Sequence, residues 1–355
     1  VLPTPLWVER DSCGPVPVAR IGSASATLVN GVFGDPLLRL ELIHRRRSLL
    51  FDLGDPGRMS ARVAHQVSDL FFSHTHADHI GGFLWFLRSR IGDFPPCRLY
   101  GPKGLAGQIA GMVGGILWDR VGERAPRFEI REWHGDHIQC FRVVAGEGAE
   151  QRLDDLPLAE GILWQESGFL VRATELDHDG TPVLAFAWES ALQLKVRRER
   201  LDALGLKHGR WLQVLKEAVI DGRLEDVIAT PDGKEHPVVN LRDNLLLVDP
   251  GHKLVYATDF ADTADNRRRV VSLAEGAHSL FCEAPFMLEH SDQARRTGHL
   301  TTRACAEIAN AAEVKYLLPF HFSRRYIRHA ADVYREIHAI SPQTVLPGFM
   351  TETSG

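Results

Sequence analysis

One stretch of the chain, Ser73-His74-Thr75-His76-Ala77-Asp78-His79-Ile80-Gly81-Gly82, decides the fold because it places four metal-binding side chains within six residues. It follows a short apolar strand predicted at 69–72 and precedes a helix predicted at 80–90. In an extended backbone His74 and His76 reach one metal ion, while Asp78 and His79 can turn to a second. Neutral imidazoles with one carboxylate suit zinc and leave a coordination position for water. Gly81 and Gly82 permit close packing where the helix begins. The sequence therefore predicts a two-metal site.

A two-metal site needs further ligands, and the ends of apolar strands are where a rigid sheet presents them. Three residues occupy such positions: His178 after 169–176, Asp259 after 254–258, and His321 after 316–320. Taken singly, each fits equally well as an ordinary polar residue at a strand end. Their shared context favours ligands.

The segment Trp133-His134-Gly135-Asp136-His137 repeats this ligand chemistry. Because it follows a strand and no helix comes after it, we interpret it as a turn. The remaining histidines are isolated, so core or surface positions are expected for them. They are His44, His65, His208, His236, His252, His278, His290, His329 and His338.

The composition is that of a globular protein, with 44% hydrophobic and 25% charged residues in a chain of 355. No apolar run reaches the length of a membrane span, and we expect no membrane association. Residues 1–10 do not form an intact signal peptide. Because residue 1 is Val rather than Met, the sequence leaves the native start, and with it export, open.

Five scattered cysteines, Cys13, Cys97, Cys140, Cys282 and Cys305, form no C-x-x-C pair. This pattern argues against a disulfide framework and a zinc ribbon, and it favours a reducing, cytoplasmic compartment. The net charge of −5 gives the surface as a whole no attraction for polyanions, so nucleic-acid binding would need a local basic patch.

Strand-like and helix-like stretches alternate along the chain, which favours one α/β domain over residues 1–355. The polar, acidic residues 146–161 are predicted to be an inserted loop. Residues 195–222 are predicted to be a helical insertion, with two helices broken at Gly205 and Gly209.

The ligand candidates, in this order, resemble the metallo-β-lactamase superfamily, and specifically its ribonuclease Z branch. The histidine loop alone indicates only the superfamily, which includes lactonases, glyoxalase II and β-lactamases. The narrower match lies in Gly298-His299-Leu300-Thr301-Thr302 and in residues 317–326, with weaker similarity at 100–105 and 204–222. The resemblance covers about residues 38–327. It implies an αββα sandwich of two mixed β-sheets flanked by helices.

Carried over residue by residue, the resemblance implies two zinc ions, with Mn²⁺ or Fe as substitutes. The first would be held by His74, His76 and His178, the second by Asp78, His79 and His321, and Asp259 would bridge them. His299 would donate a proton to the leaving group, although it also fits as a plain residue before a helix. Ser323 and Arg325 would help to bind a phosphate.

The implied reaction is attack by a hydroxide shared between the metals, with Asp78 orienting the water. The implied activity is that of a phosphodiesterase, an endoribonuclease that processes the 3′ end of transfer RNA as a homodimer. A small-molecule hydrolase acting on a lactone, thioester or β-lactam is the alternative, and a non-catalytic metal-binding or interaction protein is the third.

The sequence departs from the family in ways that bear on the substrate. The usual opening strand and glycine-rich turn are not recognisable. The family inserts a transfer-RNA-gripping arm between its third histidine and its bridging aspartate. Here that interval carries basic residues, namely Lys195, Arg197, Arg198, Arg200, Lys207 and Arg210, but Gly209-Arg210 replaces the Gly-Pro element. A basic helix can contact phosphates, and a solvated helix face fits equally well. The acidic loop at 146–161 would repel RNA near the site.

Overall fold

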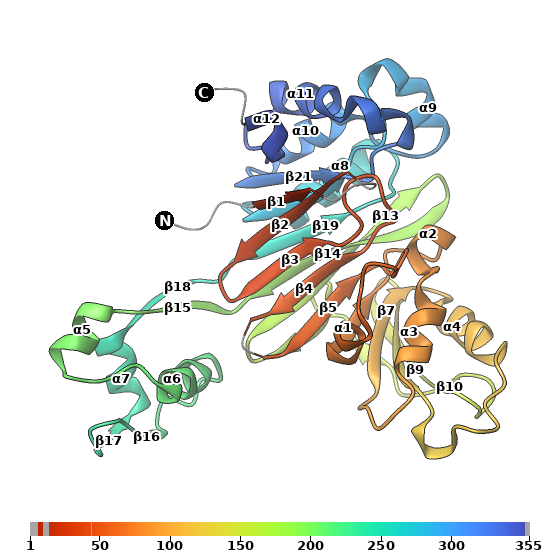
Figure 1. Cartoon of the computed structure of the whole chain (residues 1–355). Helices are drawn as coiled ribbons and strands as arrows, with labels where there is room; N and C mark the ends of the chain where they lie inside the picture. Colours follow the sequence, from red (N-terminus) through yellow and green to blue (C-terminus); the bar gives the residue numbers. More distant parts are fainter. Residues whose placement is uncertain (1–5, 10–13, 44, 352–355) are drawn as a thin grey trace. The chain divides into compact units, whose positions relative to one another are not determined.

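The computed structural model describes residues 6–9, 14–43 and 45–351 (Figure 1). Cys13 and His44 lie outside the described residues. Contacts between Cα atoms divide the chain into two compact units. Unit 1 comprises residues 1–163, 172–187 and 254–355, and unit 2 comprises residues 164–171 and 188–253.

The first sheet of unit 1 follows the order of the sequence from β1 to β10, and β11 also pairs with β9. Strands β2 to β5 pair antiparallel, β5 to β8 pair parallel, and β8 and β9 pair antiparallel, so the sheet is mixed. Parallel neighbours require crossover connections, and helices supply them here. The strands are β1 (Leu6–Glu9), β2 (Pro15–Ile21), β3 (Ala24–Leu28), β4 (Leu38–Leu42), β5 (Arg47–Phe51), β6 (Val67–Phe71), β7 (Cys97–Pro102), β8 (Arg127–Trp133), β9 (His137–Val144), β10 (Gln151–Arg152) and β11 (Leu156–Pro157).

The second sheet has the order β12-β13-β14-β19-β20-β21. β19, β20 and β21 are parallel. β13 and β14 form a hairpin through Asp179 and Gly180, both with positive φ (50° and 89°), as a two-residue turn requires. This hairpin places His178 at the end of β13. The strands are β12 (Ile162–Glu166), β13 (Phe169–His178), β14 (Thr181–Ser190), β19 (Lys253–Ala257), β20 (Ser279–Glu283) and β21 (Tyr316–Phe320).

Fully buried aromatic side chains fill the space between the two sheets. Phe51 and Phe71 of the first sheet stack with ring centres 5.1 Å apart, and both contact Phe186 of the second sheet. Tyr256 packs against Phe51 at 5.9 Å and stacks on Phe320 at 5.3 Å. Aromatic side chains bury large areas, so this layer is a main source of stability for the sandwich.

Helices cover the outer face of each sheet (Figure 1). On the first sheet, α1, α3 and α4 pack over an apolar cluster that includes Phe83, Phe86 and Ile109. On the second, α10 contacts β20 and β21 and is flanked by α8 and α11. The predicted αββα arrangement is therefore confirmed. The helices are α1 (Ala61–Gln66), α2 (Ala77–Ile80), α3 (Phe83–Ser89), α4 (Leu105–Gly114), η1 (Gly122–Arg124), α8 (Ala264–Ala274), η2 (Leu288–His290), α9 (Ser291–Arg296), α10 (Thr302–Ala311), η3 (Arg324–His329), α11 (Ala330–Ile340) and α12 (Gly348–Thr351). No helix in the described part of the chain has the length and apolar composition needed to cross a membrane.

Unit 2 has a hydrophobic core of its own, built around Leu201, Trp211, Leu215 and Leu241. Acidic and basic side chains are nearly balanced in this unit. Two helices lie within the stretch 195–222 predicted to be a helical insertion, separated by residues that include Gly205, which has φ 67°, but residues 195–196 belong to a strand instead. The elements are β15 (Leu192–Val196) paired with β18 (Leu246–Pro250), β16 (Val227–Ala229) paired with β17 (Glu235–Pro237), α5 (Arg198–Ala203), α6 (Arg210–Ile220) and α7 (Val238–Leu245).

Two stretches differ from the sequence expectation. Residues 146–161 contain two short strands, β10 and β11, which both pair with β9 instead of forming a plain loop. The helix expected over 80–90 is α3, which begins at Phe83, because Gly81 and Gly82 separate it from the short helix α2 that ends at Ile80. Gly82 packs on another backbone segment: its N–H donates to the carbonyl of Leu53 at 2.9 Å, and a Cβ there would lie 2.4 Å from the carbonyl oxygen of Gly54. The segment 134–136 is the expected turn between β8 and β9, with Gly135 at φ 86°.

Candidate metal centre

The histidine loop (residues 73–82) is fixed at its start by a buried carboxylate. Both the backbone N–H and the hydroxyl of Ser73 donate to Asp52, at 2.7 and 2.8 Å. The short helix α2 begins directly after His76, so Asp78 and His79 are helical residues, whereas His74 and His76 precede the helix. The ring centres of His74 and His79 lie 4.2 Å apart, so the loop brings its candidate ligands together.

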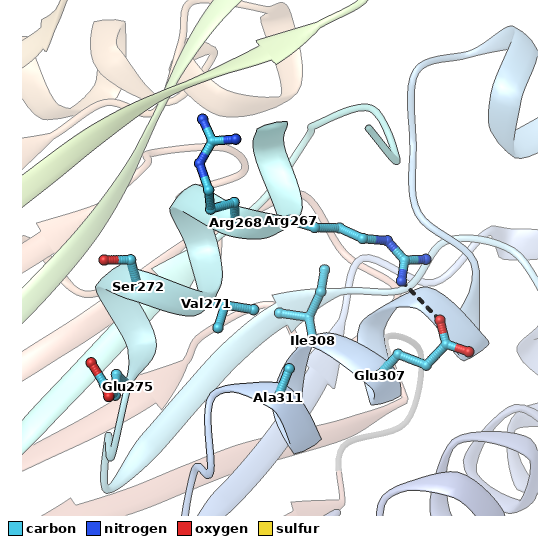
Figure 2. Close-up of a pocket in the computed structure, with 8 residues that line it drawn as sticks. All are labelled: Arg267, Arg268, Val271, Ser272, Glu275, Glu307, Ile308 and Ala311. Carbon is cyan, nitrogen blue, oxygen red and sulfur yellow. Dashed lines mark hydrogen bonds and ion pairs between the residues drawn. The ribbon is translucent and has the colours of Figure 1, made fainter. Parts of the chain in front are cut away.

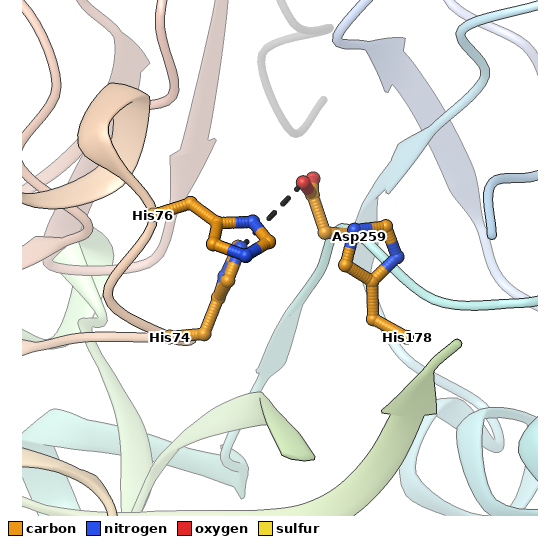
Figure 3. A group of neighbouring side chains, drawn as sticks. All are labelled: His74, His76, His178 and Asp259. Atoms are coloured by element: carbon orange, nitrogen blue, oxygen red, sulfur yellow. Dashed lines mark ion pairs between the residues drawn. The ribbon is translucent and has the colours of Figure 1, made fainter. Parts of the chain in front are cut away.

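The first group of possible ligands consists of His74, His76, His178 and Asp259, whose ligand atoms all lie within 4.8 Å of one another. Figure 3 shows these side chains facing a common centre from the histidine loop, the end of β13 and the residues after β19. His178 is oriented by its Nδ1, which lies 2.8 Å from the carbonyl oxygen of Gly298. That contact leaves its other ring nitrogen for the centre.

The second group consists of Asp78, His79, Asp259 and His321, again within 4.8 Å. Asp259 belongs to both groups, as a bridging carboxylate would. The Asp78 side chain is 43% exposed, whereas the His79 side chain is fully buried, so this group opens to solvent on the Asp78 side. All seven residues singled out from the sequence therefore converge in unit 1.

Three residues after strand ends share an unusual backbone conformation. Asp52, Asp259 and His321 have φ values of 57°, 51° and 59°, in the left-handed region that L-residues rarely adopt. They follow β5, β19 and β21, respectively. Such strain persists where the surroundings hold it, and it gathers at functional sites. Here it occurs at two candidate ligands, Asp259 and His321, and at Asp52, the carboxylate that contacts His79.

Two buried carboxylates at the site were not identified from the sequence. Asp52 accepts hydrogen bonds from Tyr256 Oη and His79 Nδ1, both at 2.8 Å. Glu283 accepts from the backbone N–H of Leu300 at 3.1 Å, and its Oε2 lies 2.9 Å from His299 Nδ1. Each comes at or just after the end of an apolar strand, the same signal that marked His178, so the pattern was available in the sequence.

The carboxylates make the site electronegative. Burial and the neighbouring His79 lower the pKa of His74 to about 3, so this imidazole is neutral. Burial would raise the pKa of Asp78, but a hydrogen bond from His321 and the charge of His79 hold it at about 2. Burial would lower the pKa of His321, yet Asp259, Asp78 and Glu283 raise it to about 10. A cation placed among these carboxylates would be strongly stabilised.

The residues present fit metal ions. Within the described residues, His74 Nε2, His79 Nε2 and His321 Nδ1 are buried and make no hydrogen bond. A buried polar atom without a partner is costly, and it calls for an explanation such as an ion. Imidazole nitrogens with carboxylate oxygens are ligands for zinc, iron or manganese.

His299 lies beside both groups, with its ring centre 4.9 Å from that of His178 and 5.6 Å from that of His321. Together with Asp259, Glu283 and His321 it forms a third set of side chains close enough to share an ion. It also borders a pocket of about 630 Å³ lined in part by Asp179, Arg295 and Arg303.

The two residues expected to bind phosphate lie just after His321. The backbone N–H of Ser323 donates to the carbonyl of Pro285 at 3.0 Å. The guanidinium of Arg325 lies over the ring of Phe286, 5.3 Å from its centre, and that ring is 6.2 Å from the His299 ring. Arg325 is thus on the His299 side of the centre.

Another pocket, of about 400 Å³, lies between α8 and α10 and is drawn in Figure 2. Arg267 and Glu307 both line this pocket, and Arg267 Nη1 donates a hydrogen bond to Glu307 Oε2 at 2.8 Å. Its lining contains no histidine, and it is separate from the groups described above.

The sequence and the fold both have known counterparts. The ribonuclease Z of Deinococcus radiodurans is 31% identical over 289 residues, which cover 78% of this chain and 82% of that protein. The ribonuclease BN of Proteus mirabilis is 25% identical over 317 residues, covering 86% and 89% of the two chains. Among solved structures, the metallo-β-lactamase fold protein YhfI of Bacillus subtilis aligns with a TM-score of 0.52 at 14% identity, over 90% of this chain and 94% of that one. No family model matches the chain.

Proposed function

Because the chain belongs to the ribonuclease Z family of the metallo-β-lactamase superfamily, we propose that it is a two-metal phosphodiesterase that cleaves RNA. The observation that carries this proposal is the pair of histidine–carboxylate groups that share Asp259. Buried ring nitrogens of His74, His79 and His321 that make no hydrogen bond and lie near Asp259 support it.

In this proposal His74, His76 and His178 would hold one zinc ion, Asp78, His79 and His321 would hold the other, and Asp259, which belongs to both groups, would serve both ions. Manganese or iron are the substitutes that the same donors accept. When bound, two such ions lower the pKa of a water and offset the negative charge that develops on a phosphoryl group. Asp52 orients His79 through the Nδ1 atom of its ring, and the carbonyl of Gly298 orients His178 in the same way.

The chain's own side chains would then handle protons and substrate. Asp78 is partly exposed and ionised, so it can orient the attacking water and accept its proton. His299, with Glu283 behind it, would give a proton to the departing oxygen. Ser323 and Arg325 would hold phosphate oxygens on the His299 side.

The finer parts of the proposal come from the relatives. Proteins similar to this chain are named ribonucleases, and on that ground we propose RNA, a 3′-extended transfer-RNA precursor in particular, as the substrate. A cytoplasmic homodimer is part of the same proposal.

A panel of substrates tests the function. Zinc-loaded protein should hydrolyse bis(p-nitrophenyl) phosphate and shorten a 3′-extended transfer-RNA precursor, without turning over a lactone, a thioester or nitrocefin. The reverse pattern would replace the proposal with a small-molecule hydrolase. Stoichiometric zinc with no turnover of any substrate would favour a non-catalytic role.

A further inference from the structure

The loop from Asn30 to Pro36, between β3 and β4, is fastened to both sides of the metal centre. Asn30 Nδ2 donates to the carbonyls of Asp35 and Asp55, each at 2.9 Å. On the side of the histidine loop, the N–H of Gly54 donates to the carbonyl of Pro36 at 3.0 Å. On the side of His321, the N–H of Phe322 donates to the carbonyl of Val32 at 2.8 Å. The loop therefore has a fixed place next to both ligand segments.

Asp35 is the charged residue of this loop, and it lies close to Asp78. The Cβ position of Gly54 lies 2.5 Å from Asp35 Cβ and 2.4 Å from the carbonyl oxygen of Asp78. The Asp35 side chain is 35% exposed. It therefore stands at the solvent-facing edge of the second ligand group, where Asp78 is also exposed.

Arg324 reaches Asp35 from the other side of the centre. Its Nη2 lies 3.7 Å from Asp35 Oδ1, and the Arg324 side chain is 77% exposed. Arg324 and Arg325 are adjacent in the chain but have different partners. Arg325 lies over Phe286, whose ring centre is 6.2 Å from that of His299, whereas Arg324 is paired with Asp35.

We propose that Arg324 binds an anionic group of the substrate on the Asp78 side of the centre and that Asp35 is its positioning residue. The inference rests on the proposed function and names a substrate class: phosphodiesters with a second phosphate on the part of the molecule that lies away from His299. A loose, exposed ion pair contributes little stability. Arg324 can therefore exchange Asp35 for a phosphate, which it binds with two parallel hydrogen bonds. Arg325 holds the scissile phosphate, and Arg324 holds its neighbour.

Two matched substrates test this assignment. Thymidine 5′-(p-nitrophenyl phosphate) has one anionic group, and its 3′-phosphorylated analogue has two, with the same leaving group. The ratio of their kcat/KM values measures the preference for the second phosphate. Arg324→Ala should reduce that preference about tenfold, mainly through KM, and leave the singly charged ester unchanged. Arg324→Lys should restore part of it, because the charge is retained.

The positioning role of Asp35 is tested by replacing it both in the presence and in the absence of Arg324. Asp35→Ala should reduce the preference about threefold in the wild-type background and have no further effect once Arg324 is replaced, because the two residues act as a unit. Arg328→Ala is the matched control, since Arg328 is exposed on the same turn η3 and should leave the ratio unchanged. An equal loss on both esters, or the same loss with Arg328→Ala, would overturn the assignment.

The inference and the proposed function can fail separately. If the wild type hydrolysed neither ester, the proposed function would fall. Binding of thymidine 3′,5′-bisphosphate against thymidine 5′-monophosphate, measured by calorimetry on zinc-loaded protein, would then decide the role of Arg324. Tighter binding of the bisphosphate that is lost in Arg324→Ala supports the inference, and equal binding by the two proteins rejects it.

Discussion

Oε2 of Glu283 lies 2.9 Å from Nδ1 of His299, and the Glu283 side chain is fully buried. Burial would raise the pKa of Glu283, but the positive charge and hydrogen bond of His299 hold it at about 2. Burial would lower the pKa of His299, and the carboxylate of Glu283 raises it instead. The pair therefore favours the protonated imidazole beside the candidate metal centre, which is the form that a general acid needs.

Replacing His299 by Ala should slow the cleavage of RNA by about 10²- to 10⁴-fold, the range for loss of general acid catalysis. Bis(p-nitrophenyl) phosphate should lose much less, because p-nitrophenolate departs without a proton. Glu283→Gln should show the same dependence on the leaving group with a smaller loss. Zinc content, measured alongside, should stay at two per chain in both variants. If His299→Ala lost one zinc ion, His299 would instead be a metal ligand, which its position beside Asp259, Glu283 and His321 allows.

His76→Ala should abolish hydrolysis and lower the zinc bound per chain, because His76 is one of only two loop histidines in the first ligand group. His137→Ala is the matched control. His137 also belongs to a His-x-x-His stretch that includes an aspartate, but it is the first residue of β9, directly after the turn, and its Nδ1 contacts Asp136. In this control variant, the zinc content per chain and the turnover of bis(p-nitrophenyl) phosphate should both be unchanged. Full activity in His76→Ala would reject the metal mechanism.

The difference between these histidines shows which parts of the site could be predicted from sequence. His74, His76, Asp78 and His79 lie on one loop, so their convergence is a local property that spacing reveals. The αββα sandwich followed from the alternation of elements and from the family resemblance. Strand ends indicated His178, Asp259 and His321, but only the resemblance assigned them to particular ions.

What could not be predicted depends on contacts between distant segments. The strand-end position of Asp52 is visible in the sequence, but only the fold shows that this carboxylate contacts Ser73, His79 and Tyr256. The pairing of residues 151–157 with β9 is likewise set by a neighbouring strand, because the segment itself is short, polar and without periodicity. The start of the expected helix after Gly82 is imposed by the backbone of Leu53 and Gly54.

That close approach predicts opposite effects for two Gly→Ala changes. In Gly82→Ala the new Cβ would meet the carbonyl oxygens of Gly54 and Leu53 at 2.4 and 2.9 Å. Neither is the end of a flexible side chain, so we expect a loss of about 1–3 kcal/mol in the free energy of unfolding. Gly107 lies exposed inside α4 with nothing within 4 Å of its Cβ position. Gly107→Ala should therefore stabilise the protein by about 0.5–1 kcal/mol. Urea unfolding measures both, and a neutral Gly82→Ala would contradict the packing argument.

Asp69 predicts a pH-dependent contribution to stability. Its buried carboxylate lies 2.6 Å from both Arg98 Nε and Arg47 Nη2. Burial would raise the pKa of Asp69, but the hydrogen bond and charge of Arg98, with Arg47, hold it below the usual value. A lowered folded-state pKa adds stability that is complete above the unfolded pKa of about 3.9 and is lost as the pH falls through the folded value.

Asp69→Asn should therefore cost about 3 kcal/mol at pH 7, and the difference from wild type should shrink below about pH 4. Urea unfolding at a series of pH values checks both statements. Glu147→Gln, which removes an exposed partner of Arg142 at 3.3 Å, is the control and should cost less than about 1 kcal/mol. A difference for Asp69→Asn that stayed constant down to pH 2 would show that the carboxylate's charge is not the cause.

If unit 2 contacts RNA, as the proposed function would allow, long RNA should be bound differently from a small ester. Its charges nearly balance, so any attraction for RNA must come from a local group of cations, and Arg198 and Arg200 are exposed on α5. If they contact phosphates, replacing both by Ala should weaken binding of a transfer-RNA precursor and reduce the slope of log K against log salt by about 2. Turnover of bis(p-nitrophenyl) phosphate should not change, since this substrate needs only the metal centre.

Arg223→Ala is the matched control, because Arg223 is also exposed in unit 2 but is paired with Asp221 and Asp226. An unchanged salt slope in the double variant would mean that this helix face is merely solvated, and RNA recognition would then have to be sought in unit 1.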